Sequence, residues 1–182
     1  MTESPVTTLL IFGASGDLTS RLLLPGLGSL LAVEPQRRVR VVGADRAELS
    51  QQDWHDKIRM AMQEEECPQD RVADLLTTAD YVKADLLEPD QLRSLIGAQE
   101  GPLVLYFALP PQVSVKLCAL LEDVTLPEGT RLALEKPFGH DLDTARALNR
   151  QLLRVVPEEQ IHRVDHFLGV NTVLYLIGIR FA

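Results

Sequence analysis

The hydrophobic residues of this chain fall into short, β-branched runs that alternate with longer stretches of helical periodicity. The short runs predict strands, because a parallel strand buried on both faces needs only about four to eight apolar residues. The longer stretches repeat their apolar positions with the period of a helix. The predicted strands are residues 6–12, 39–44, 81–83, 103–109 and 131–135, and the predicted helices are residues 18–33, 49–65, 89–96, 112–122 and 142–155.

This alternation of strand and helix predicts an α/β fold, a doubly wound parallel sheet of the Rossmann-like kind with right-handed crossovers. At 182 residues with 46% hydrophobic residues, the chain has the size of one domain. The apolar segment 168–182 is also expected to be helical. Because the sequence stops there without a cap, a glycine or a polar tail, we expect the chain to be the first domain of a longer protein of two domains.

The clearest chemical signal is the turn after the first predicted strand, Gly13-Ala14-Ser15-Gly16-Asp17-Leu18. Its glycines leave the backbone open to a ligand, and the helix behind it offers unpaired N–H groups, so the turn favours an anion such as a pyrophosphate. Asp17 is expected to cap that helix. Thr19 stands where a dinucleotide fingerprint usually has its third glycine or alanine, so the motif by itself leaves a plain strand-to-helix turn open.

A pair of charged residues, Asp45 and Arg46, follows the second predicted strand. The carboxyl end of a strand is where an open parallel sheet binds ligands. A carboxylate at this position binds a ribose hydroxyl, as in NAD, whereas an arginine pairs with the 2′-phosphate of NADP. We favour NADP because of Arg46 and keep NAD open because of Asp45.

Two further groups of residues follow later strands. Ala108-Leu109-Pro110-Pro111 ends the most apolar strand and would offer backbone and shape beside a cofactor. Glu135-Lys136-Pro137-Phe138-Gly139 would project Lys136 over the edge of the sheet, next to a proline that could be cis. A strand terminator and a surface lysine are the alternative readings of these two groups.

The last candidate group is the run from His162 to Gly169, which places Asp165 beside His166. An imidazole next to a carboxylate can bind a phosphate or relay a proton. His162 and His166 lack the helical His-Glu-x-x-His pattern, so no metal site is predicted.

The net charge of the chain bears on which kinds of binding partner it can have. The formal net charge is -8, from 18 basic and 26 acidic residues, which argues against a nucleic-acid or acidic-membrane surface. No targeting signal precedes residue 6 and no apolar run approaches the roughly 20 residues of a membrane span, so we expect a soluble, cytoplasmic protein. Cys67 and Cys118 are expected to be reduced thiols.

Taken together, four motifs resemble the coenzyme domain of the glucose-6-phosphate dehydrogenase family: the glycine turn at 13–18, residues 108–111, residues 135–142 and residues 163–169. The resemblance implies oxidation of a sugar phosphate, glucose 6-phosphate, to 6-phosphogluconolactone with NADP, at the entry to the pentose phosphate pathway. It also implies that residues 1–182 form the dinucleotide-binding domain, with 161–182 leading into an absent β+α substrate domain, and that the full-length protein is a homo-oligomer.

By position in these motifs, the resemblance implies specific roles. Lys136 would contact sugar and nicotinamide, Pro137 would be cis, and His166 would bind the substrate phosphate with Asp165 beside it, so that Lys136 and Asp165 are the catalytic candidates. The implied coenzyme contacts are Gly13, Ala14, Ser15, Gly16, Asp17, Leu18, Arg46, Ala108, Leu109, Pro110 and Lys136.

The chain departs from the family pattern near the expected sugar pocket. Ser20 and Arg21 stand where the family has a lysine after the glycine turn, and Phe167 and Val170 replace a tyrosine and a lysine. We therefore expect poor affinity for glucose 6-phosphate, or a different sugar. A non-catalytic nucleotide-binding module is the alternative from another class. The family's general base is a histidine of the absent domain, so this chain alone is predicted to bind coenzyme without turnover.

Overall fold

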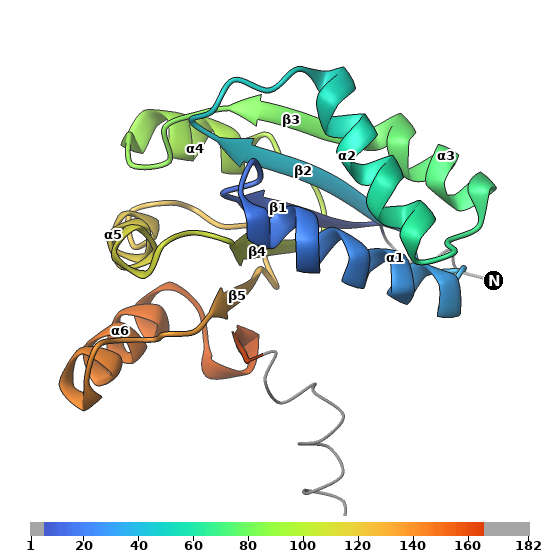
Figure 1. The fold of residues 1–182 in the computed structure, drawn as a ribbon. Helices are drawn as coiled ribbons and strands as arrows, with labels where there is room; N and C mark the ends of the chain where they lie inside the picture. Colours follow the sequence, from blue (N-terminus) through green and yellow to red (C-terminus); the bar gives the residue numbers. More distant parts are fainter. Residues whose placement is uncertain (1–5, 166–182) are drawn as a thin grey trace, which may run out of the picture.

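The computed structural model describes residues 6–165, which form one six-stranded parallel sheet with helices on both faces (Figure 1). The strand order is β3-β2-β1-β4-β5-β6. This order confirms the predicted doubly wound α/β fold. The strands are β1 (Thr7–Phe12), β2 (Val39–Asp45), β3 (Asp80–Lys83), β4 (Leu103–Phe107), β5 (Arg131–Glu135) and β6 (Ile161–Val164).

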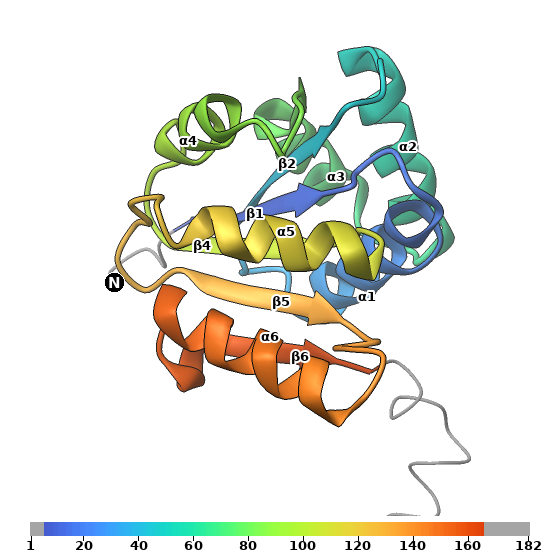
Figure 2. The same ribbon diagram turned by 90° about the vertical axis from the view of Figure 1, so that its left-hand side faces the viewer.

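The helices divide evenly between the two faces of the sheet. Helices α1, α2 and α3 cover β1, β2 and β3 on one face, and α4, α5 and α6 lie on the other (Figures 1 and 2). Short helical segments at Thr19–Leu23 and Glu158–Gln160 complete the connections. The bounds are α1 (Leu24–Val33), α2 (Gln51–Glu64), α3 (Gln69–Thr78), α4 (Pro89–Gly97), α5 (Pro111–Leu121) and α6 (Leu142–Val155).

Each face of the sheet has its own hydrophobic core, because successive residues of a strand point to opposite sides. On β1, Ile11 packs with Trp54 of α2, while Phe12 packs in the other core against Phe107 of β4. The two phenylalanine rings meet edge to face with centroids 5.4 Å apart. Complete burial of such a side chain contributes about 1.5–3 kcal/mol, so the two cores together fix the sheet between its helical layers.

The central strand β1 marks the point where the strand order reverses. From β1 the chain steps to β2 and β3 on one side, then returns to β4 on the other side. The loops after β1 and β4 therefore diverge at the carboxyl edge of the sheet, and such a switch point is where doubly wound sheets bind ligands.

Four local predictions differ from the structure. Helix α3 and strand β6 were not predicted as separate elements, and β4 ends at Phe107 rather than at residue 109. The prediction that Asp17 caps the first helix is wrong, because helical backbone already begins at Asp17. The carbonyl of the preceding residue, Gly16, accepts hydrogen bonds from the N–H and the hydroxyl of Ser20. The expected helix at 168–182 lies outside the described residues.

Candidate functional site

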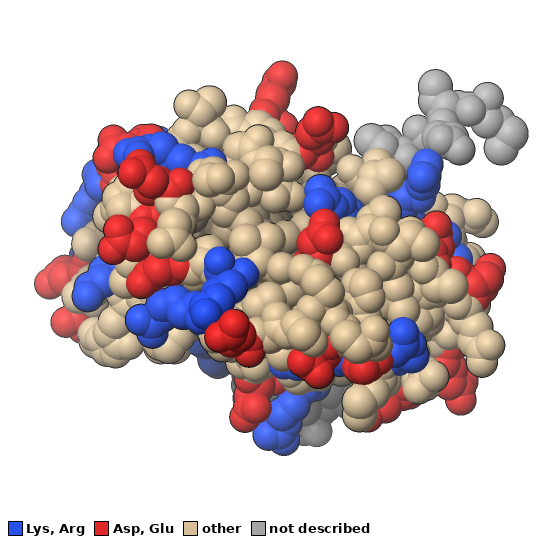
Figure 3. Space-filling view, turned by 90° about the horizontal axis from the view of Figure 1, so that it is seen from above, with Lys and Arg blue, Asp and Glu red and all other residues tan. Residues whose placement is uncertain are grey.

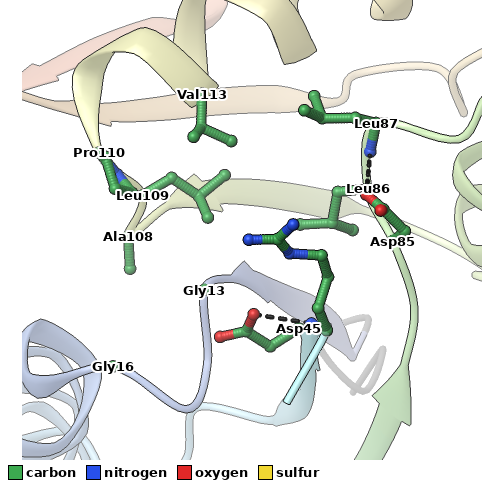
Figure 4. A pocket seen from close by; sticks show the side chains of 11 residues that line it. Gly13, Gly16, Asp45, Asp85, Leu86, Leu87, Ala108, Leu109, Pro110 and Val113 are labelled. Atoms are coloured by element: carbon green, nitrogen blue, oxygen red, sulfur yellow. Dashed lines mark hydrogen bonds between the residues drawn. The ribbon is translucent and has the colours of Figure 1, made fainter.

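A cavity of about 330 Å³ opens at the carboxyl ends of the four strands β1 to β4 (Figure 4). The cavity is lined by the glycine turn, by the charged pair at the end of β2 and by apolar side chains from the loops after β3 and β4. The residues that line it are Gly13, Gly16, Asp45, Arg46, Asp85, Leu86, Leu87, Ala108, Leu109, Pro110 and Val113.

At Gly13, the loop after β1 packs closely against the loop after β4. Its φ of +85° is a conformation that residues with a side chain rarely adopt. A Cβ built on Gly13 would lie 2.2 Å from the carbonyl oxygen of Ala108. Because Ala108 also donates its N–H to Phe12 across 2.9 Å, the two loops leave no room for a side chain. Packing between the two loops therefore also explains why this position needs a glycine, in addition to the ligand contact predicted for Gly13.

Gly16 lines the cavity and is less tightly enclosed than Gly13. A Cβ at Gly16 would meet only the carbonyl oxygen of Gly13, at 3.3 Å. The helical backbone that starts at Asp17 has its N-terminus directly after Gly16, and the N–H groups of a first helical turn favour an anion. The structure thus places Gly16 between the cavity and the start of the helical backbone, and its contact with a phosphate group remains a prediction.

Asp45 is held at the mouth of the cavity by three hydrogen bonds. One carboxylate oxygen accepts the Ser15 hydroxyl at 2.6 Å and the Ser15 N–H at 3.3 Å. The other oxygen accepts the N–H of Arg46 at 2.7 Å (Figure 4). The ammonium of Lys57, on α2, donates to the Ser15 carbonyl at 3.2 Å. The charged pair predicted from sequence is thus joined to the glycine turn.

The loop after β3 supplies a wall of the cavity that the sequence reasoning missed. Asp85, Leu86 and Leu87 line it together with Leu109 and Val113. The Asp85 carboxylate accepts the N–H of Leu87 at 3.0 Å, which fixes the loop. The signal was present, because a third strand at 81–83 was predicted and the residues after it belong to the same edge of the sheet.

Lys136 and Asp165 come together beyond the neighbouring strands β5 and β6. The Lys136 ammonium lies 2.9 Å from both carboxylate oxygens of Asp165. The Lys136 side chain is 46% exposed and that of Asp165 is 25% exposed. The peptide bond between Lys136 and Pro137 is cis, as the sequence suggested. Lys136 does not line the cavity described above, so the pair forms a second group on the same edge of the sheet.

The residue before Lys136 is fixed from the neighbouring strand. The Tyr106 hydroxyl of β4 donates to the Glu135 carboxylate at the end of β5. Burial raises the pKa of Tyr106 well above its usual range, and the hydrogen bond and charge of Glu135 raise it further. Tyr106 therefore stays a neutral donor at physiological pH.

Several predicted contacts do not line the cavity, and one lies outside the described residues. Ala14, Ser15, Asp17 and Leu18 belong to the glycine turn but do not line the cavity. His166 lies outside the described residues. Within residues 6–165 no group of three His, Cys, Asp or Glu side chains could hold a metal ion.

The described part of the chain also bears on the sequence-based expectations for membrane spans, surface charge and cysteines. None of its helices is both long and apolar enough to cross a membrane.

Acidic and basic side chains are interspersed over the face shown in Figure 3, with no continuous basic surface on that face. Cys67 and Cys118 are buried and unpaired with each other, which agrees with the predicted reduced thiols.

Comparison with known proteins gives one family. The sequence profile described as "Glucose-6-phosphate dehydrogenase, NAD binding domain" matches residues 10–174. Glucose-6-phosphate 1-dehydrogenase of Schizosaccharomyces pombe is 32% identical over 188 residues, covering 96% of this chain and 38% of that protein. The enzyme of that name from Gluconobacter oxydans is 37% identical over 185 residues, covering 94% and 38%.

A solved structure agrees with the sequence comparisons. The crystal structure of glucose-6-phosphate 1-dehydrogenase from Mycobacterium avium matches with a TM-score of 0.77 at 28% identity, covering 94% of this chain and 41% of that one. The chain thus spans about 38% of the length of the curated relatives that it matches.

Proposed function

The chain belongs to the glucose-6-phosphate dehydrogenase family, and on that premise we propose that it is the coenzyme-binding unit of an oxidoreductase that oxidises a sugar phosphate such as glucose 6-phosphate. The observation that supports this proposal most strongly is the cavity at the switch point, bounded by the glycine turn and the charged end of β2. The 182-residue chain by itself is proposed to bind coenzyme without turnover.

The residues present are suited to a nicotinamide dinucleotide. Gly16 lines the cavity without a side chain, at the turn where a pyrophosphate needs close backbone approach. The apolar side chains of Leu86, Leu87 and Leu109 offer a surface for a flat base, and Asp45 and Arg46 offer charged contacts for a ribose. When bound, the coenzyme supplies the acceptor for the hydride that leaves the substrate carbon.

Lys136 and Asp165 are proposed to act on the sugar. An ammonium group donates up to three hydrogen bonds, so Lys136 can hold Asp165 and still bind a sugar oxygen. The Asp165 carboxylate orients the ammonium. Both groups are partly exposed at the carboxyl edge, so a substrate can reach them without rearrangement of the core.

The replacement of a family tyrosine and lysine by Phe167 and Val170 supports a second candidate function. A non-catalytic nucleotide-binding module would keep the cavity and lose recognition of the sugar phosphate, and a dehydrogenase for another sugar would keep Lys136. Calorimetry with glucose 6-phosphate and with unphosphorylated glucose on the coenzyme-loaded chain separates these candidates. Heat only with the phosphorylated sugar supports the first proposal, and heat with neither favours the module.

Coenzyme binding itself is tested by Gly16→Ala, with Gly26→Ala as the matched control. A Cβ at Gly26 would meet nothing within 4 Å, so that variant adds the same methyl group away from the cavity. Overpacking by a methyl group costs about 1–3 kcal/mol, which is roughly 5- to 150-fold in Kd. Calorimetric titration with NAD⁺ and NADP⁺ should show this loss for Gly16→Ala alone. Failure of the unaltered chain to bind either dinucleotide overturns the proposal.

A further inference from the structure

We propose that Asp45 makes this coenzyme site selective for NAD over NADP. The inference rests on the proposed function, since it concerns which dinucleotide the same cavity takes. It departs from the sequence prediction, which favoured NADP because of Arg46.

The carboxylate of Asp45 occupies the place where the two dinucleotides differ. Asp45 ends β2, the position at which an acidic side chain binds the adenosine ribose hydroxyls and a basic one binds a 2′-phosphate. Asp45 lines the cavity (Figure 4). A 2′-phosphate at this position would lie against a negative charge.

Asp45 cannot easily turn away from such a phosphate. Its carboxylate accepts the Ser15 hydroxyl at 2.6 Å, the Ser15 N–H at 3.3 Å and the Arg46 N–H at 2.7 Å. Rotation of the side chain would break all three hydrogen bonds. The donors of Ser15 that a phosphate could use are therefore already engaged by the carboxylate.

The backbone around this arrangement is tightly packed. Gly13 and Ala14 both donate their N–H groups to the Ala44 carbonyl, at 2.9 and 3.3 Å. A Cβ at Gly43 would lie 2.8 Å from the Cβ of Ala14. The end of β2 and the glycine turn are thus in direct contact, so the distance between Ser15 and Asp45 is fixed by the fold.

The two nearby cations, Arg46 and Lys57, do not reverse the proposed preference for NAD over NADP. The Arg46 side chain is exposed and makes no ion pair with residues 6–165, and solvent screens an exposed charge strongly. The Lys57 ammonium is bound by the Ser15 carbonyl at 3.2 Å. Asp45, which lines the cavity together with Arg46, is partly buried and is held in place by three hydrogen bonds. Arg46 remains available to stack on the adenine, a contact that both dinucleotides offer equally.

The test is calorimetric titration of the chain with NAD⁺ and with NADP⁺. We expect NAD⁺ to bind at least about tenfold more tightly, because like charges brought together at a binding site are strongly unfavourable. Asp45→Ala should lower the ratio of the two affinities by about tenfold or more. Asp45→Asn removes the charge and keeps an oxygen that can accept the Ser15 hydroxyl, so it tests the same point if Asp45→Ala does not fold.

Glu48→Ala is the matched control. It removes a carboxylate three residues further along the chain, one that is 89% exposed and paired with Lys83 at 3.1 Å outside the cavity, so the affinity ratio should stay within about twofold of the unaltered chain. Binding of NADP⁺ as tight as that of NAD⁺ overturns the inference and leaves the proposed function standing. An unchanged ratio in both Asp45 variants also overturns it. If neither dinucleotide binds, the proposed function fails and the inference with it.

Discussion

The hydroxyl of Ser15 donates a hydrogen bond of 2.6 Å to the carboxylate of Asp45, although 30 positions separate the two residues along the chain. Ser15 belongs to the turn after β1, and Asp45 is the last residue of β2. Parallel pairing of β1 with β2 places Phe12 beside Ala44, so the residues that follow each strand meet. This contact connects the glycine turn, where we propose that a phosphate binds, with the end of β2, where we propose that a ribose binds.

Gly13→Ala is expected to destabilise the protein. The new Cβ would require a positive φ and would overlap the Ala108 carbonyl, 2.2 Å away. Backbone strain of this kind costs about 1–3 kcal/mol, and the overlap adds to it. Urea unfolding followed by circular dichroism measures the change.

The control for this change is Gly26→Ala, at an exposed position inside α1. Alanine there should be neutral or stabilising by roughly 0.5–1 kcal/mol, since glycine is unfavourable in a helix. Equal midpoints for the two variants would show that Gly13 has no steric role.

Stability should fall at alkaline pH because of the Cys118 thiol. Burial raises the pKa of Cys118 from 9.0 to about 12. Between these two values the unfolded chain loses the thiol proton and the folded chain keeps it, so the unfolded state is favoured as pH rises. The slope approaches about 1.4 kcal/mol per pH unit for one group.

Cys118→Ala removes that contribution. Unfolding free energies measured from pH 9 to pH 12 should fall less steeply for the variant than for the unaltered chain, whatever the cost of the substitution at neutral pH. Identical slopes in the two proteins would mean that Cys118 ionises equally well in the folded state.

Lys136→Met should change stability little, because the pair with Asp165 is partly exposed and such pairs contribute about 0–1 kcal/mol. Arg154→Met is a suitable comparison. Arg154 makes two hydrogen bonds with Glu122, at 2.8 and 2.9 Å, far from the carboxyl edge. Thermal unfolding should give similar small changes for both variants, while only Lys136→Met should weaken sugar binding to the coenzyme-loaded chain. A large loss of stability for Lys136→Met alone would indicate a structural role.

Helix α3 shows where local patterns were too weak for prediction. Its buried residues are Val72 and Leu75, in a stretch otherwise rich in polar and acidic side chains. Two apolar positions give little periodicity, so only packing against α2 and β2 identifies the helix. By contrast, the continuous apolar run predicts β4 clearly, although the strand ends at Phe107, two residues earlier than predicted, because the chain bends at Leu109.

The sequence by itself determined the alternation of strands and helices, the glycine turn and the family, because periodicity and glycine spacing are local properties of the chain. Only the tertiary structure decided that Asp45 binds Ser15, that Lys136 binds Asp165 and that Asp85 to Leu87 complete the cavity. These contacts depend on which strands are neighbours and in what register they pair. A hydrophobic pattern specifies which face of a strand is buried, but it does not name the strand that lies beside it.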